Sequence, residues 1–294
     1  MIQDIFPSKL DNHYTDAEAA EQDFVLRMDG DGRLLVKITD AQITFPTGAQ
    51  IPRDGAAYLF DVDGQKYFLE NGKSGAADGS ADAGASEAEA SAGGVLSGYE
   101  FKSLRELRDS CVGKELLIAF TAYHLWKWYR DSRFCGRCGA ATEHDSKERA
   151  MRCPACGNVI YPRINPAVIV GVIKGDSILI TRYRTGFGHN ALVAGFTEIG
   201  ETLEETVARE VMEETGVRVK NIRYYKSQPW GMAQDILTGF YCEADGDAQI
   251  QMDANELRYA EWVKREDVVL QPNNLSLTNE MMRMFRDGKI GGTT

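Results

Sequence analysis

The stretch GFTEIGETLEETVAREVMEETGV, residues 195–217, decides the architecture of the second half of this 294-residue chain. Its middle part has apolar residues at helical spacing and ends in Gly-Val, which predicts a helix with a glycine stop. At about 100° per residue, Glu210, Glu213 and Glu214 fall within one arc of this helix, and the aliphatic residues, such as Val211, occupy the adjacent arc. The carboxylates are therefore predicted along the edge of the buried face.

Three like charges so close together repel each other unless a cation joins them. Carboxylate oxygens are hard ligands that favour Mg²⁺ or Mn²⁺, so we predict one of these ions as a catalytic cofactor. Arg209 and Glu201 are expected to form an orienting ion pair, and Gly195 permits a tight loop beside the metals. The alternative is a solvated acidic helix, and Glu204 and Glu205 need be no more than that.

Apolar runs around this helix predict a sheet. NPAVIVGVIKGDSILITRYR (165–184) has the pattern of two buried strands around a turn, and RYYKSQPW, DILTGFYCEA and YAEWVKRED follow as further strands. LTNEMMRMFRDGK predicts a last helix that ends at Gly288. Strands with one strongly marked helix favour an α+β fold, with an α/β/α sandwich in this half.

Four of the six cysteines form the metal-ligand pattern C-x2-C-x14-C-x2-C: Cys135, Cys138, Cys153 and Cys156. Four thiolates complete a tetrahedral Zn²⁺ shell, which predicts a structural zinc with no open position. Two disulfides or a redox pair are the alternatives, and an intracellular chain makes disulfides a poor explanation. Cys111 and Cys242 belong to no motif and are expected to be buried free thiols.

The first part of the chain has a different pattern. Residues 13–70 carry short alternating stretches broken by DGDG and DVDG, which predict a small β-rich module. Residues 71–98 are rich in alanine, glycine and serine and contain no aromatic residue, which predicts a flexible loop or linker. Residues 99–130 are helical in pattern, with Leu116, Phe120, Tyr123 and Lys127 near one stripe and Leu117 and Trp128 beside it.

Charge and hydropathy exclude some classes of protein. The 33 Lys+Arg and 44 Asp+Glu give a formal charge of −11, which opposes binding to a nucleic-acid duplex. The start, MIQDIFPSKLDNHY, lacks the basic and apolar regions of a secretory signal. No apolar run approaches the ~20 residues of a membrane helix. We expect a soluble, cytoplasmic protein with no membrane partner.

Residues 195–217 fit the pattern G-x5-E-x7-R-E-U-x-E-E-x-G-U at every position, where U is aliphatic. This is the Nudix box, and the chain resembles a Nudix hydrolase. The resemblance implies that metal ions bound to a diphosphate neutralise its charge and orient an attacking water. A glutamate accepts the proton of that water; the box glutamates and the later Glu256 are candidates.

The order of motifs is similar to that of the NADH pyrophosphatase family: RFCGRCG, RCPACGNVIYPR, PAVIV, the Nudix box and SQPW. The resemblance implies a degenerate Nudix-like module at 1–130, a zinc ribbon at 131–162 and a catalytic Nudix domain at 163–294. It also implies a homodimer that cuts NADH or NAD⁺ to NMN(H) and AMP. Some family members remove NAD caps from RNA.

The family's site residues are assigned to the matching positions of this chain. Metal ligands would be the carboxylates of Glu210, Glu214 and Glu256 and the carbonyl of Ala194, with Glu213 as their companion. Phe196 would stack on a substrate ring. The remaining substrate contacts implied by the resemblance are Arg105, Glu148, Tyr161, Ser227, Gln228, Pro229, Trp230 and Asp235.

The chain departs from the family in one segment. The family array reads SQPWPFPxS, whereas residues 227–235 read SQPWGMAQD. The loss of two prolines and a phenylalanine predicts a less rigid and less aromatic loop, and Asp235 adds negative charge. Another substrate is therefore an alternative: ADP-ribose, a diadenosine polyphosphate or the 5′ end of an NAD-capped RNA. A non-catalytic nucleotide sensor is a further alternative. Trp230 could also be a core aromatic, and Asp235 a strand-start residue.

Overall fold

The computed structural model describes residues 1–70, 96–186 and 188–290, and the chain divides into two compact units. The predicted linker at 71–98 lies outside the described residues as far as residue 95. The first unit comprises Met1–Gln3, Ile164–Trp230 and Gln234–Thr294, and the second comprises Asp4–Arg163 and Gly231–Ala233.

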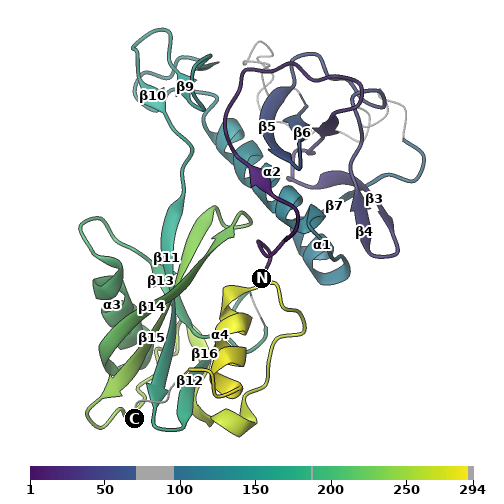
Figure 1. The fold of residues 1–294 in the computed structure, drawn as a ribbon. Coiled ribbons are helices and arrows are strands. Elements are labelled where there is room, and N and C mark those ends of the chain that lie inside the picture. The colour runs from purple at the N-terminus through teal and green to yellow at the C-terminus, as the bar shows by residue number, and fades with distance from the viewer. Residues whose placement is uncertain (71–95, 187, 291–294) are drawn as a thin grey trace. The chain divides into compact units, whose positions relative to one another are not determined.

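The first unit is built on a six-stranded mixed sheet (Figure 1). In sheet order its strands are β14 (Arg218–Trp230), β15 (Asp235–Asp245), β11 (Asn165–Lys174), β12 (Ser177–Tyr183) and β16 (Leu257–Lys264), with β13 (Val193–Phe196) paired to β11. β11 runs parallel to β15 and antiparallel to β12 and β13. A short 3-10 turn, η2 (Arg265–Asp267), follows β16.

Both faces of β11 are buried, and its residues alternate between two cores. Valines such as Val170 share one core with Val211 of α3 (Leu203–Thr215). Isoleucines such as Ile169 share the other with Met281 of α4 (Leu277–Arg286). Figure 1 shows these helices on opposite faces of the sheet. The predicted α/β/α sandwich is confirmed, and burial on both faces explains why PAVIV is a continuous apolar run.

Helix α3 begins and ends where its sequence predicts. Thr202 accepts a hydrogen bond from the backbone N–H of Glu205, and the Glu205 carboxylate accepts one from the N–H of Thr202, which forms a capping box. At the other end Gly216 adopts a positive φ of 67°, the left-handed conformation that favours glycine. These caps define where the helix begins and ends.

The second unit contains two small sheets and two helices. One sheet has the order β1 (Leu10–Asp11), β5 (Ala57–Val62), β6 (Gln65–Leu69) and β2 (Phe24–Leu26). The other has the order β4 (Gln42–Thr44), β3 (Leu34–Thr39) and β7 (Glu100–Lys102), and the helices are α1 (Leu104–Ser110) and α2 (Glu115–Asp131). Strand β7 falls inside the segment expected to be helical, because its backbone pairs with β3. In α2, Leu116, Leu117, Phe120 and Trp128 are buried, whereas Tyr123 and Lys127 of the predicted stripe are only half-buried.

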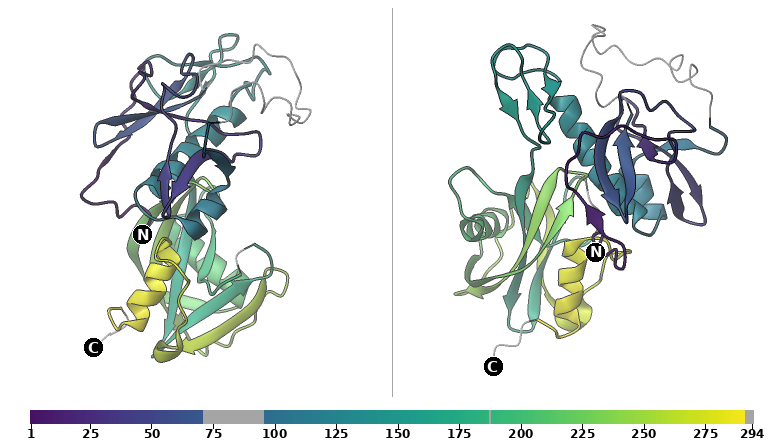
Figure 2. Two further views of the ribbon diagram at one scale, coloured as in Figure 1. Left: turned by 90° about the vertical axis from the view of Figure 1, so that its right-hand side faces the viewer. Right: turned by 45° about the horizontal axis from the view of Figure 1, so that its top comes forward.

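Three short strands follow α2: β8 (Glu143–His144), β9 (Met151–Arg152) and β10 (Val159–Ile160). They form their own small sheet beyond the end of the helix (Figure 2). Cys111 and Cys242 are buried free thiols, as predicted. In the described part of the chain, every helix is too short or too polar to cross a membrane.

Candidate functional site

The four motif cysteines converge in the small sheet after α2. The Sγ atoms of Cys135 and Cys156 lie 3.6 Å apart, and those of Cys138 and Cys153 lie 3.5 Å apart. Tetrahedral zinc with 2.3 Å Zn–S bonds requires about 3.8 Å between sulfurs, whereas a disulfide needs about 2.05 Å. The quartet therefore fits zinc and excludes disulfides.

Each pair of cysteines sits in the same backbone turn. The N–H of Cys135 donates to the carbonyl of Ala140, and the N–H of Gly139 donates back to the carbonyl of Cys135, both at 2.8 Å. The same two bonds recur around Cys153 and Gly157. Gly139 and Gly157 have φ values of 75° and 73°, so both turns require glycine. The backbone turns thus place both thiols of each pair on the same side of the site.

The guanidinium of Arg209 gathers the carboxylates of α3. Its Nε and Nη2 atoms donate to Glu201 at 2.5 and 2.9 Å, which is the expected ion pair. Nη1 donates to Glu210 at 2.8 Å and to Glu213 at 2.9 Å, and Nη2 also reaches the carbonyl of Phe196 at 2.9 Å. The bond from Arg209 lowers the pKa of Glu201 to about 2. One cation therefore orients three carboxylates and the end of β13.

Gly195 allows the Glu210 carboxylate to lie directly against β13. A Cβ atom at this position would fall well inside the van der Waals radii of all three Glu210 carboxylate atoms. The need for glycine here is steric, because Gly195 has no positive φ. Burial raises the pKa of Glu210, opposed by the bonds from Arg209.

Glu214 is the most deeply buried acid of the helix, with 2% of its surface exposed. Its Oε1 atom accepts a hydrogen bond from the hydroxyl of Tyr183 at 3.2 Å, whereas Oε2 is buried and lacks a partner among the described residues. Burial, reinforced by the charges of Glu210 and Glu256, raises the pKa of Glu214 to about 8. A buried carboxylate oxygen without a partner is costly unless a cation compensates it. This site therefore fits a hard divalent cation such as Mg²⁺ or Mn²⁺.

Two further candidate ligands belong to β13 and to the segment before β16. The carbonyl oxygen of Ala194, in β13, is 3.3 Å from the hydroxyl of Tyr183, which also reaches Glu214. Glu256 is exposed immediately before β16, and its charge contributes to the raised pKa values of Glu210 and Glu214. Ala194 and Glu214 thus meet at the Tyr183 hydroxyl, whereas Glu256 is linked to Glu210 and Glu214 through its charge.

Phe196 and the SQPW segment lie at the ends of two strands. Phe196 ends β13 with 53% of its surface exposed, so its ring is free to stack on a ligand. Ser227 and Pro229 are exposed near the end of β14. Gln228 is different: it is fully buried, and both N–H groups of its amide are used, by Gln3 and by the carbonyl of Leu275. We therefore remove Gln228 from the candidate substrate contacts.

The departure from the family array has a structural counterpart. Trp230 is half-buried at the end of β14, so it is not a core residue. Asp235 is the first residue of β15 and only 6% exposed; burial raises its pKa to about 6. Gly231 belongs to the second unit, where a Cβ atom would collide with the backbone carbonyl of Phe120. A proline at this position is therefore incompatible with the contact seen here.

The three remaining predicted contacts lie in the second unit. The hydroxyl of Tyr161 donates to the carboxylate of Glu148 at 2.9 Å, so the structure pairs these two residues. Arg105 is exposed on α1. Their roles in binding substrate stay predictions.

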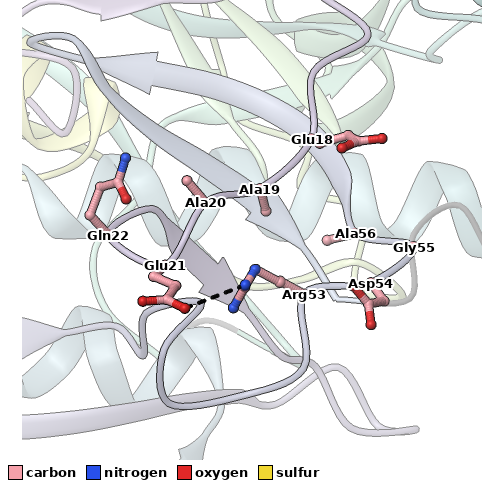
Figure 3. Close-up of a pocket in the computed structure, with 9 residues that line it drawn as sticks. All are labelled: Glu18, Ala19, Ala20, Glu21, Gln22, Arg53, Asp54, Gly55 and Ala56. Carbon is pink, nitrogen blue, oxygen red and sulfur yellow. Dashed lines mark ion pairs between the residues drawn. The ribbon is translucent and has the colours of Figure 1, made fainter.

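The second unit also has an open cavity of about 700 Å³ (Figure 3). Its charged lining consists of Glu18, Glu21, Asp54 and Arg53. The guanidinium of Arg53 pairs with Glu21 at 3.5 Å and donates to the carbonyl of Gly48 at 3.0 Å. Three carboxylates and one arginine that is already paired would repel a diphosphate. The candidate site is therefore the group that we call the acids around α3: Glu201, Glu210, Glu213, Glu214 and Glu256.

Two side chains of the site carry no signal in the motif. Thr206 donates to Glu201 at 3.0 Å, and Tyr183 contacts Glu214 and Ala194. Strand periodicity holds a clue to Tyr183, because Leu179, which packs in the core under α3, lies four residues earlier and therefore on the same face of β12.

Two family models match the chain. The NUDIX domain model matches residues 163–285, and the NADH pyrophosphatase zinc ribbon domain model matches residues 130–161. The matched segments contain the acids around α3 and the four motif cysteines, respectively.

Curated relatives extend this similarity over a longer segment. A protein named NAD-capped RNA hydrolase NudC from Klebsiella pneumoniae is 42% identical over 178 residues, which cover 59% of this chain and 67% of that protein. A protein of the same name from Escherichia coli O1:K1 is 41% identical over 177 residues, with the same coverage. A crystal structure of a NUDIX hydrolase from Nitrosomonas europaea aligns with 53% of this chain and 91% of its own, at 20% identity and a TM-score of 0.46.

Proposed function

We propose that this chain, which belongs to the NADH pyrophosphatase family of Nudix hydrolases, cleaves the diphosphate bond of NAD(H)-like dinucleotides. The products would be NMN(H) and AMP, formed by attack of water at phosphorus. The observation that carries the proposal is the buried, unpartnered Oε2 atom of Glu214 within a complete set of box acids. A protein that only sensed nucleotides would not need this set, whose burial is costly.

The chain's own residues would hold the cation and the substrate. Glu210, Glu214, Glu256 and the carbonyl of Ala194 would bind Mg²⁺ or Mn²⁺, which supplies charge neutralisation and an acidified water. Arg209 fixes the direction of the Glu210 and Glu213 carboxylates, so little reorganisation is needed during the reaction.

Proton transfer needs a carboxylate that is within reach of water and is not neutralised by burial. Glu213 is exposed, and its Oε2 atom accepts a hydrogen bond from Arg209, which leaves Oε1 available as a base. Glu214 is too deeply buried to exchange protons with solvent water directly. We therefore favour Glu213 over Glu214 as the general base.

The zinc ion would have a structural role. Four thiolates fill the tetrahedral shell of Zn²⁺ and leave no position for water or substrate. The ribbon also shapes its own ligands through the paired turns at Cys135 and Cys153. Catalysis would thus depend on the oxygen-ligated cation alone.

NAD-capped RNA is a second candidate substrate, because the curated relatives carry that name. The net charge of −11 disfavours long RNA, but a single-stranded 5′ end needs only a small basic channel. The altered residues Gly231–Asp235 also leave room for other dinucleotides.

The test is product analysis by chromatography with Mn²⁺ and five separate substrates: NADH, NAD⁺, ADP-ribose, diadenosine tetraphosphate and a short NAD-capped RNA. We expect NMN(H) and AMP, with an NAD-containing substrate cleaved fastest. Faster cleavage of ADP-ribose or the diadenosine compound would contradict the assigned substrate class. Binding of NAD⁺ without any metal-dependent product would contradict the hydrolase itself.

The same product analysis can be applied to the variant Asp235→Ser. It restores the family's residue and removes a buried acid, so we expect the NADH to ADP-ribose rate ratio to rise about threefold to tenfold. Asp247→Ser, which removes an exposed acid from the turn after β15 in the same unit, is the control and should leave the ratio unchanged.

A further inference from the structure

Among the described residues, Tyr183 is the side chain whose hydroxyl connects two of the proposed metal ligands. Its hydroxyl lies 3.2 Å from Oε1 of Glu214, which belongs to α3, and 3.3 Å from the carbonyl oxygen of Ala194, in β13. The N–H of Ala194 donates to the same hydroxyl at 3.1 Å. One oxygen atom therefore contacts both the helix and the strand that supply the cation site.

The hydrogen-bond inventory of a phenol limits what this group can do. A tyrosine hydroxyl has one proton to donate and lone pairs with which to accept. Here the Ala194 N–H occupies an accepting position, so the single proton goes either to Glu214 or to the Ala194 carbonyl. A cation that took the Ala194 carbonyl would leave Glu214 as the acceptor. In that arrangement Tyr183 holds the Glu214 carboxylate in one orientation.

The strand carrying Tyr183 extends this connection to a third ligand. Tyr183 pairs with Leu257 of β16, and the register of β12 and β16 shifts between Arg182 and Tyr183. Leu257 follows Glu256 directly, and the N–H of Arg184 donates to the Glu256 carbonyl at 2.9 Å. The position of Tyr183 is thus fixed by the same strand pairing that places Glu256.

We propose that Tyr183 is a positioning residue that prepares the Glu214 carboxylate and the Ala194 carbonyl to bind the catalytic cation. The proposal rests on the proposed function, because it assigns Tyr183 a role toward the cation of that reaction. Tyr183 does not touch the substrate in this role. Its loss weakens cation binding and leaves recognition of the dinucleotide intact.

A matched control lies on the same sheet. The hydroxyl of Tyr225, in β14, is 3.3 Å from Oε1 of Glu280, in α4. It is likewise a partly buried tyrosine bonded to a glutamate, but it packs in the core on the α4 face. Tyr225→Phe therefore removes an equivalent hydrogen bond away from the acids around α3.

The experiment titrates Mn²⁺ into zinc-containing, otherwise metal-free protein and measures free Mn²⁺ by electron paramagnetic resonance. Wild type, Tyr183→Phe and Tyr225→Phe are compared without substrate, and kcat and KM for NADH are then measured across the same Mn²⁺ range. Zinc content and thermal midpoint are determined on the same samples to compare folding.

We expect Tyr183→Phe to raise the Kd for Mn²⁺ about tenfold, as loss of a hydrogen bond to a charged group implies. Its kcat should fall at low Mn²⁺ and recover in part at saturation, with KM for NADH unchanged. Tyr225→Phe should match wild type in Mn²⁺ affinity.

A Tyr183→Phe protein with wild-type Mn²⁺ affinity would overturn the proposal, even if its thermal midpoint fell, because that result would make Tyr183 merely structural. If wild type binds Mn²⁺ but cleaves no dinucleotide, the proposed function fails while the titration still decides the role of Tyr183. If wild type binds no Mn²⁺, both fail.

Discussion

The cysteine quartet and the acids around α3 solve the same problem, that of holding a cation, in opposite ways. The quartet draws all its ligands from two short turns, and its sulfur atoms already lie within 4.8 Å of one another. The proposed oxygen ligands come from α3, from the carbonyl of Ala194 in β13 and from Glu256 before β16, and Arg209 orients one of them, Glu210. The four thiolates fill every position around a zinc ion. The oxygen ligands come from separate elements and would leave positions on their cation open to a substrate phosphate.

The largest difference between the two sites should follow from replacing one acid by its neutral amide. Glu214→Gln keeps the shape of the side chain but removes a charged ligand, so we expect turnover to fall by at least ~10³-fold with zinc content unchanged. Glu213→Gln should have a similar effect through loss of the base. Steady-state kinetics with NADH and Mn²⁺ measure both.

Glu204→Gln is the matched control for these variants, because Glu204 is an exposed acid in the first turn of the same helix. It should retain wild-type turnover within about twofold. Wild-type activity in both the Glu213 and the Glu214 variants would remove the acids around α3 as the site.

A second change tests whether the oxygen site depends on close backbone approach. Gly195→Ala places a methyl group where the Glu210 carboxylate lies. We expect turnover to fall about 100-fold as this carboxylate is displaced. Gly188→Ala is the control, because a Cβ atom there meets nothing closer than 4.0 Å. Equal kinetics for the two variants would show that the contact with Gly195 is not needed.

A third change tests whether the cysteine quartet holds the zinc ion. Cys153→Ser removes a buried ligand, so we expect zinc to fall from one ion per chain to near zero and the thermal midpoint to drop by several degrees. Cys242→Ser, in a buried thiol outside the quartet, should keep its zinc. Elemental analysis and a thermal melt decide the result; full zinc retention in Cys153→Ser would contradict the quartet.

The smallest expected effect is a pH dependence of stability. Burial raises the pKa of Glu214 to about 8 in the folded protein, whereas the unfolded value is about 4.3. The protonated form is favoured on folding, so this contribution to stability is complete below about pH 4 and is lost as the pH rises through 8. The Glu214→Gln variant has no carboxyl group to ionise, so its free energy of unfolding should not fall for this reason.

Without added divalent cations, we therefore expect the free energy of unfolding of Glu214→Gln to exceed that of wild type by on the order of 2 kcal/mol at pH 8.5. The difference should disappear near pH 4.5, and Mn²⁺ should reduce it at high pH by compensating the carboxylate. Urea denaturation across this pH range provides the measurement. A difference independent of pH would mean that Glu214 is not forced to ionise in a buried position.

The two sites also differ in how far their sequences predict them. The spacing of Cys135, Cys138, Cys153 and Cys156 predicts all four ligands of the ribbon site, because a backbone turn of a few residues places each pair. The pattern of residues 195–217 predicts α3, its ends and the Arg209–Glu201 pair, all of which depend on helix geometry. The pattern cannot predict Tyr183, because this residue lies outside it, on β12, 31 residues before its partner Glu214.

Long-range packing also explains why Gln228 is misassigned from sequence. In the array SQPW it has the appearance of a substrate contact, yet its carbonyl accepts from the N–H of Leu277 at 2.6 Å at the start of α4. The partner lies 49 residues further along the chain, so no local pattern can reveal it. This buried amide stabilises the start of α4, and its hydrogen-bonding groups are already used within the protein.

The most direct test of the division between the two sites is a Mn²⁺ titration of the wild-type protein, with zinc content, bound Mn²⁺ and NADH cleavage measured on each sample. We expect one zinc per chain throughout, no cleavage before Mn²⁺ is added, and turnover that rises in parallel with Mn²⁺ occupancy. Cleavage by the zinc-containing protein without Mn²⁺ or Mg²⁺, or turnover independent of Mn²⁺ occupancy, would contradict a structural ribbon and a catalytic site of oxygen ligands.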